Sequence, residues 1–140
     1  INADKVKNLD VLCNLSNITR ISFGFHSMID ISFMKNMNNI ESIYYNNSEI
    51  IGGNISYLVS SPKLKDLFYY HTSSNNIDFL QGANALENLE LWHAFSWDSN
   101  ISVLTTLPQL KTLEFNGALS DAQKAVCAEL MSKGVSVRFI

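Results

Sequence analysis

The residues with the greatest capacity for chemistry are two histidines, His71 and His93. Imidazole binds transition metals and changes its charge near neutral pH. If the two side chains occupy equivalent places on neighbouring strands, they lie within about 5 Å of each other and could share a metal ion or form a pH-sensitive pair. No third ligand falls in the same register, so we expect two surface neighbours and no metal site.

A catalytic triad can be drawn from His93, Ser96 and Asp98, which are close together in the sequence. The chain supplies no motif for an oxyanion hole, and it contains no G-x-S-x-G, G-x-x-x-x-G-K or H-E-x-x-H pattern. We therefore expect no catalytic residues and no cofactor.

A second group of residues combines aromatic rings with carboxylates at recurring intervals. Its aromatic members are Tyr44, Phe68, Tyr70 and Trp92, and its acidic members are Asp66, Glu90 and Glu114. An aromatic centre with a polar rim is typical of the hot spots at which proteins bind each other. The alternative is that aromatic side chains simply suit strands, where Tyr and Trp tolerate partial exposure.

The elements that must position these side chains form an internal repeat. The pattern apolar-x-x-apolar-x-apolar occurs five times at nearly even spacing along the chain. The last two members of each triplet share one face of a strand, and the residues beside them point to the other face. The triplets are Ile18-Ile21-Phe23, Ile40-Ile43-Tyr45, Leu64-Leu67-Tyr69, Leu86-Leu89-Leu91 and Leu110-Leu113-Phe115.

The segments between the triplets carry apolar residues at irregular or near-helical spacing. We expect these segments to return the chain along the convex side and to close the core. Pro62 and Pro108 each precede a triplet, where a proline ends the return segment. The apolar sets are Ile31, Met34 and Met37; Ile55, Leu58 and Val59; Ile77, Leu80 and Ala83; and Ile101, Leu104 and Leu107.

Equivalent strand positions form ladders across the free face, because neighbouring strands are about 4.8 Å apart. One predicted ladder contains Ser22, Tyr44, Phe68, Glu90 and Glu114, and the next contains Gly24, Asn46, Tyr70, Trp92 and Asn116. Arg20, Ser42, Asp66, Asn88 and Thr112 flank them on one side, and His71 and His93 lie at the strand ends on the other. The predicted partner-binding residues are therefore Tyr44, Phe68, Tyr70, Trp92, His71, His93, Asp66, Glu90 and Glu114.

Two stretches, NNIDFLQGANALENLELW (75–92) and SNISVLTTLPQLKTLEF (99–115), resemble the leucine-rich-repeat family, in particular the short 22-residue subclass of bacterial internalins. The resemblance covers roughly residues 11–117. It implies an α/β solenoid, a horseshoe with a parallel concave sheet of about 5–6 strands and short helical or irregular convex segments. The family's asparagine after the strand is replaced, so hydroxyl groups and water would have to satisfy the turns. The replacing residues are His26, Ser48, Thr72, Ala94 and Ala118.

We expect a single domain over residues 1–140, with a helical cap at 1–17, five repeats at 18–117 and a helix-and-strand cap at 118–140. Ser120 with Gln123 forms a capping box for a helix that runs to about Lys133, and Gly134 suits its end. Residues 135–140 alternate as a final strand. The first cap would pack through Ala3, Val6, Leu9, Val11 and Leu12, and the last helix through Val126, Cys127, Leu130 and Met131.

Charge and composition exclude several partners. The net charge of −3, with no basic stripe, makes nucleic acid a poor partner. No apolar run approaches the length that a membrane-spanning helix needs, so we expect no membrane association. Cys13 and Cys127 match no metal or redox spacing, which predicts two buried thiols and a cytoplasmic location.

Three functions remain open. The first is a non-catalytic protein-binding module that uses the concave face, specifically a bacterial immunity protein that masks a toxin domain carrying a basic patch. The second is a structural or adhesive repeat segment of a larger surface-exposed or secreted bacterial protein, which the start at Ile1 and the exposed final strand would favour. The third and most remote is a hydrolase or metal enzyme that uses His71 and His93.

Overall fold

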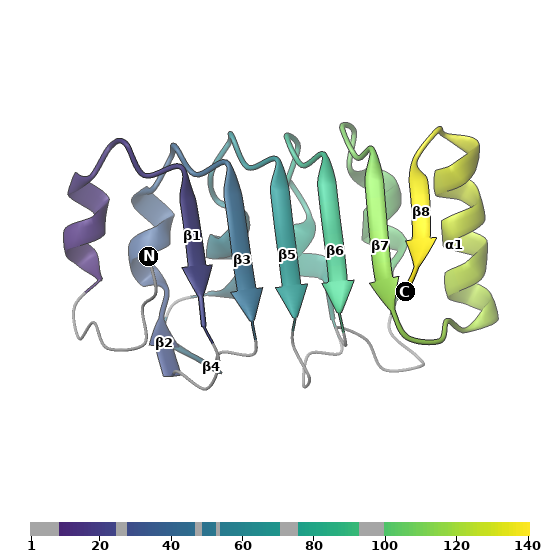
Figure 1. The fold of residues 1–140 in the computed structure, drawn as a ribbon, viewed down its shortest axis with the longest axis horizontal. Coiled ribbons are helices and arrows are strands. Elements are labelled where there is room, and N and C mark those ends of the chain that lie inside the picture. The colour runs from purple at the N-terminus through teal and green to yellow at the C-terminus, as the bar shows by residue number, and fades with distance from the viewer. Residues whose placement is uncertain (1–8, 25–27, 47–48, 53, 71–75, 93–99) are drawn as a thin grey trace.

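Six parallel strands form one open sheet in the computed structural model, which describes residues 9–24, 28–46, 49–52, 54–70, 76–92 and 100–140 (Figure 1). Every pair of neighbouring strands is parallel. In spatial order the strands are β1 (Arg20–Phe23), β3 (Ser42–Asn46), β5 (Asp66–Tyr70), β6 (Asn88–Trp92), β7 (Thr112–Asn116) and β8 (Ser136–Phe139). The prediction of a parallel sheet of five to six strands is confirmed, and the arrangement is compatible with a solenoid.

The apolar triplets pack on one side of this sheet. The register aligns the second members of the triplets with one another across the strands, and the third members likewise. Both sets are buried, and four of the five leading residues are buried with them. The two ladders are Ile21, Ile43, Leu67, Leu89 and Leu113, and Phe23, Tyr45, Tyr69, Leu91 and Phe115. The predicted spacing therefore identifies the core side of each strand.

Two of these core residues are tyrosines, Tyr45 and Tyr69, whose rings stack with centroids 5.3 Å apart. Both side chains are fully buried. Burial raises the pKa of the Tyr45 phenol far above its ordinary value, and the neighbouring Tyr69 adds to the shift. The Tyr45 hydroxyl therefore stays protonated in the folded protein at any ordinary pH.

The return segments are short 3-10 helices, and those between β3 and β7 lie behind the sheet in Figure 1, whereas the purple helix lies beside the sheet, beyond β1. A 3-10 helix completes one turn in three residues, so apolar residues three apart share its inner face. Buried triplets such as Ile31, Met34 and Met37 follow this rule. The predicted positions of the return segments between successive strands of the sheet are confirmed. The helices are η1 (Asp10–Asn14), η2 (Ser32–Asn36), η3 (Ile55–Val59), η4 (Asp78–Leu80) and η5 (Ser102–Thr106).

An Asx turn precedes four of the five 3-10 helices. The side chains of Asp30, Asn54, Asn76 and Asn100 each accept a hydrogen bond from the backbone N–H two residues on, at 2.8, 2.9, 2.6 and 2.9 Å. Their spacing along the chain repeats that of the triplets. They satisfy backbone donors at the start of each return segment, where no intrahelical acceptor exists. The hydroxyl groups and water expected at the turns after the strands concern other positions of the chain, and that expectation stays a prediction.

Of the five positions at which the family asparagine is replaced, Ala118 is described. His26, Ser48, Thr72 and Ala94 lie outside the described residues.

A second parallel sheet of two strands, β2 (Met28–Asp30) with β4 (Glu49–Gly52), follows the ends of β1 and β3. The sequence patterns did not predict it.

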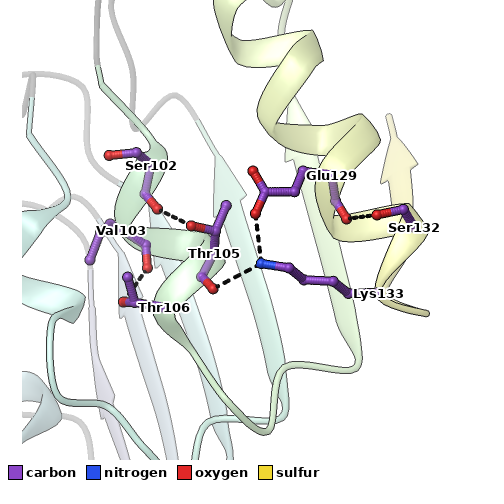
Figure 2. A network of polar contacts seen from close by, with 7 residues as sticks. All are labelled: Ser102, Val103, Thr105, Thr106, Glu129, Ser132 and Lys133. Atoms are coloured by element: carbon purple, nitrogen blue, oxygen red, sulfur yellow. Dashed lines mark hydrogen bonds and ion pairs between the residues drawn. The ribbon is translucent and has the colours of Figure 1, made fainter.

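The C-terminal cap is a helix, α1 (Asp121–Ser132), followed by β8. The predicted capping box is confirmed: the Gln123 N–H donates to Ser120 Oγ at 3.3 Å, and the Ser120 N–H donates to Gln123 Oε1 at 2.9 Å. Gly134, with φ of 89°, takes the left-handed conformation that ends the helix. Lys133 donates to Glu129 on α1 and to the Thr105 carbonyl on η5, which ties the helix to the last return segment (Figure 2).

Two predicted packing residues are exposed instead. Met131 on α1 is 50% exposed, because it is one step around the helix from the buried Leu130. Val11 in the N-terminal cap is 56% exposed, because the 3-10 geometry of η1 places Leu9 and Leu12, three residues apart, on the inner face. Residues 1–8 of this cap lie outside the described residues. Within the described residues, no helix has the length and hydropathy needed to cross a membrane.

Candidate protein-binding face

The side of the sheet that faces the viewer in Figure 1 is opposite the 3-10 helices between β3 and β7, and we call it the open face. It carries three rows of side chains. Strand register defines the rows. The first row is Arg20, Ser42, Asp66, Asn88, Thr112 and Ser136; the middle row is Ser22, Tyr44, Phe68, Glu90, Glu114 and Arg138; the last row is Asn46, Tyr70, Trp92 and Asn116. The structure therefore brings together seven of the nine predicted site residues on one surface.

Three aromatic rings of the open face contact one another. Tyr44 and Phe68 stack in parallel, with ring centroids 4.2 Å apart and an angle of 7° between the planes. Phe68 also contacts Trp92, with centroids 5.7 Å apart and an angle of 47°. Offset and tilted ring pairs of this kind stabilise by about 0.5–1.5 kcal/mol each beyond the area they bury. Strands β3, β5 and β6 thus present one continuous aromatic cluster.

These rings are less exposed than the sequence predicts. Tyr44 is 41% exposed, whereas Phe68, Tyr70 and Trp92 are half-buried. Phe68 contacts both Tyr44 and Trp92, so these three rings partly cover one another. Asn46, expected on the free side, is only 3% exposed, and its amide donates to the Tyr44 hydroxyl at 3.2 Å. The cluster is therefore held in place before any partner arrives.

The indole N–H of Trp92 is buried and has no hydrogen-bond acceptor in the part of the chain that the structure describes. A buried donor without an acceptor costs about 1–3 kcal/mol.

The acidic residues lie beside the aromatic cluster. Glu90 is directly opposite Phe68 on one neighbouring strand and Glu114 on the other. Glu114 accepts from the guanidinium of Arg138 at 3.1 Å, whereas Glu90 forms no ion pair within the described residues. Partial burial raises the pKa of Glu90, and the nearby Glu114 carboxylate raises it further.

A chain of hydrogen bonds orients the first row. The Thr112 hydroxyl donates to the Asn88 side-chain oxygen at 2.7 Å, and the Asn88 amide donates to Asp66 at 2.7 Å. Asp66 is thereby held as an acceptor, with its carboxylate on the open face.

The first and middle rows line a shallow groove of about 540 Å³. Its middle is acidic, with Asp66, Glu90 and Glu114 on β5 to β7, and Arg20 and Arg138 lie at its two ends. Tyr44 and Phe68 form its aromatic wall. Such a surface can bind a cationic or aromatic side chain of another molecule.

The other two predicted site residues, His71 and His93, lie outside the described residues, as do Ser96 and Asp98. Within the residues that are described, no group of three or more His, Cys, Asp or Glu side chains could hold a metal ion. Cys127 is buried and free, and burial raises the pKa of its thiol. The side chain of Cys13 is outside the described part of the molecule.

Two features of the structure were not predicted from the sequence. Arg138 completes the middle row, and it follows Glu114 at the same interval that separates Glu114 from Glu90. The Asx turns were missed although their residues recur at the interval of the triplets. Both signals were present in the periodicity.

No family model matches the chain, and no curated protein matches it either.

Proposed function

We propose that this chain is a non-catalytic, leucine-rich-repeat protein-binding module that uses the open face of its parallel sheet as the concave surface of a short horseshoe. Its partner is another protein with a basic patch. The specific role proposed is that of a bacterial immunity protein, which neutralises a toxin domain in the cytoplasm by covering it.

The observation that carries this proposal is the aromatic cluster of Tyr44, Phe68 and Trp92. Core packing does not require rings here, because the opposite side of the same strands already buries the apolar triplets. Aromatic residues in a preorganised cluster supply most of the binding energy in many protein interfaces. The acidic middle of the groove supports a basic partner, since opposite charges raise the association rate and disfavour wrong partners.

The experiment is a comparison of partner capture by two variants. Tyr44→Ala removes the most exposed ring of the cluster, and Tyr57→Ala removes a half-buried tyrosine from η3 on the opposite side of the sheet. A protein retained from a bacterial lysate by the wild type and by Tyr57→Ala, but lost with Tyr44→Ala and identified by mass spectrometry, is the expected result. Equal retention by all three forms would refute binding through the open face.

The immunity role has its own test. Co-expression with the identified partner should restore growth of cells that the partner alone inhibits, and Tyr44→Ala should reduce that rescue. A captured partner that does not inhibit growth would leave the binding module intact and end the immunity proposal.

A second candidate is a repeat segment of a larger surface-exposed or secreted protein. It is favoured by the apolar surface of the last strand, where Phe139 is 56% exposed and Ile140 is 61% exposed. Lengthening the chain with further residues from its own gene should then cover these side chains and raise the melting temperature. An unchanged melting temperature would count against this candidate.

A further inference from the structure

The middle row has an order that folding does not explain. From β3 to β8 it reads Tyr44, Phe68, Glu90, Glu114, Arg138, and each residue is directly opposite the next in the strand register. Two rings are followed by two acids and one base. Like charges directly opposite each other on neighbouring strands are destabilising, so the Glu90 and Glu114 pair carries a cost.

The chain neutralises only one of the two acids itself. Arg138 contacts Glu114 at 3.1 Å, while no Lys, Arg or His in the described residues pairs with Glu90. The other charged groups around the groove are Asp66, which accepts from Asn88, and Arg20 on β1 at the far end. Among the described residues, Glu90 is therefore the groove glutamate that forms no ion pair.

The surroundings of Glu90 match a planar cation. Tyr44 and Trp92 both contact the Phe68 ring, and Phe68 is directly opposite Glu90, with both residues lining the groove. A guanidinium group stacks on aromatic faces and pairs with a carboxylate through two parallel N–H donors, whereas a lysine ammonium is a strongly hydrated point charge. The intramolecular pair of Arg138 with Glu114 already places one guanidinium on the adjacent acid.

Resting on the protein-binding function proposed above, we propose that the groove at Glu90 is a binding site for one arginine side chain of the partner protein, with its guanidinium against the Phe68 ring and paired with the Glu90 carboxylate. The site deepens the proposed function by naming the residue that the partner must supply. Partial burial and the Glu114 carboxylate raise the pKa of Glu90, and a bound cation would act in the opposite direction.

The test uses small probes, so that it does not depend on the partner. N-acetyl-arginine amide is titrated into isotope-labelled protein and followed by NMR at the Trp92 indole N–H and at the backbone of Phe68, Glu90 and Glu114. The matched probes are N-acetyl-citrulline amide, which keeps the shape of arginine without its charge, and N-acetyl-lysine amide. We expect saturable chemical-shift changes at these positions with the arginine amide. The lysine amide should bind with an affinity at least about threefold weaker, and the citrulline amide should cause no change.

The variants separate the site from general charge effects. Glu90→Gln should weaken arginine-amide binding by about tenfold, because it keeps the side-chain volume and removes the charge. Glu41→Gln, the same change at an exposed acid outside the groove, should leave binding unchanged. Equal binding of arginine and citrulline, or equal affinity in Glu90→Gln, would overturn the proposal.

The outcome also separates this site from the proposed function. Loss of partner capture in Tyr44→Ala without any arginine-amide binding would reject the arginine site and keep the protein-binding module. Arginine-amide binding at Glu90 with equal capture by wild type and Tyr44→Ala would keep the site and reject the module.

Discussion

The two sides of the same strands follow different rules. On the core side, Leu89 and its equivalents are buried and apolar on the strands from β1 to β7, and their positions recur at one spacing. On the open face, Glu90 lies one residue away on the same backbone, between an aromatic ring and a second acid. The core side therefore follows the requirements of burial, whereas the open face carries polar, charged and aromatic side chains on the same strands.

The largest expected effect is on the core side. Leu89→Ala removes a fully buried side chain and should lower the free energy of unfolding by about 2–5 kcal/mol through the cavity it leaves. Chemical denaturation monitored by circular dichroism measures the loss. Glu90→Ala, one residue along the strand, is the control, and a loss as large as that of Leu89→Ala would mean that the two faces have been assigned in reverse.

The next effect is on binding through the open face. Tyr44→Ala should weaken the affinity for the protein partner by about 2 kcal/mol, as truncation of an interface hot spot does. Its cost in stability should be about 1–3 kcal/mol, because it loses one ring stack and the hydrogen bond from the buried Asn46 amide. Isothermal titration calorimetry and thermal denaturation give the two values. Tyr57→Ala should show no change in affinity, and a weakening there equal to that of Tyr44→Ala would remove the distinction between the faces.

A smaller effect concerns pH. Burial and Glu114 raise the folded-state pKa of Glu90, so the penalty for its charge is present above that pKa and is relieved as the pH falls through it. Protonation also removes the carboxylate that a cation needs. Binding of arginine amide should therefore weaken by about tenfold as Glu90 becomes protonated, while the contribution of Glu90 to stability improves.

Titration of affinity against pH in wild type and Glu90→Gln measures this effect. The wild type should lose affinity on acidification and converge on the weak affinity of Glu90→Gln. Parallel curves for the two proteins would show that another group controls the pH dependence of arginine-amide binding.

The smallest effect is on stability in the absence of a partner. Glu90→Gln removes the repulsion from Glu114 and should raise the free energy of unfolding, but solvent screening limits the gain to about 0.5 kcal/mol or less. Denaturation curves at neutral pH measure it against Glu41→Gln, which should be neutral. A decrease in Glu90→Gln would mean that the acid stabilises the fold and is not reserved for binding.

The sequence predicted the parts of the fold that depend on repetition. Burial of Ile43, Leu67 and Leu89 follows from spacing alone, because side chains on a strand alternate and neighbouring strands repeat the alternation. The capping box at Ser120 joins two residues that are three positions apart, so it could also be predicted from the sequence. These features needed no knowledge of tertiary contacts.

Other features depended on contacts that one sequence does not encode locally. The exposure of Met131 and Val11 follows from which helix face meets the sheet, and from the choice of a 3-10 turn over an α turn. The half-burial of Trp92 reflects its contact with Phe68 on the neighbouring strand, and the buried Asn46 donates to the Tyr44 hydroxyl on its own strand. Within the candidate site, the row order was predicted, whereas the ion pair of Arg138 with Glu114 required the sixth strand.

Binding of a protein by the open face is tested most directly by hydroxyl-radical footprinting of the complex. This method reports the solvent exposure of individual side chains. Oxidation of Tyr44, Phe68 and Trp92 is compared with that of Tyr57, before and after addition of the captured partner. We expect strong protection of the three open-face rings from oxidation and no change in the oxidation of Tyr57. Protection of Tyr57 with undiminished oxidation of Tyr44 and Phe68 would contradict it.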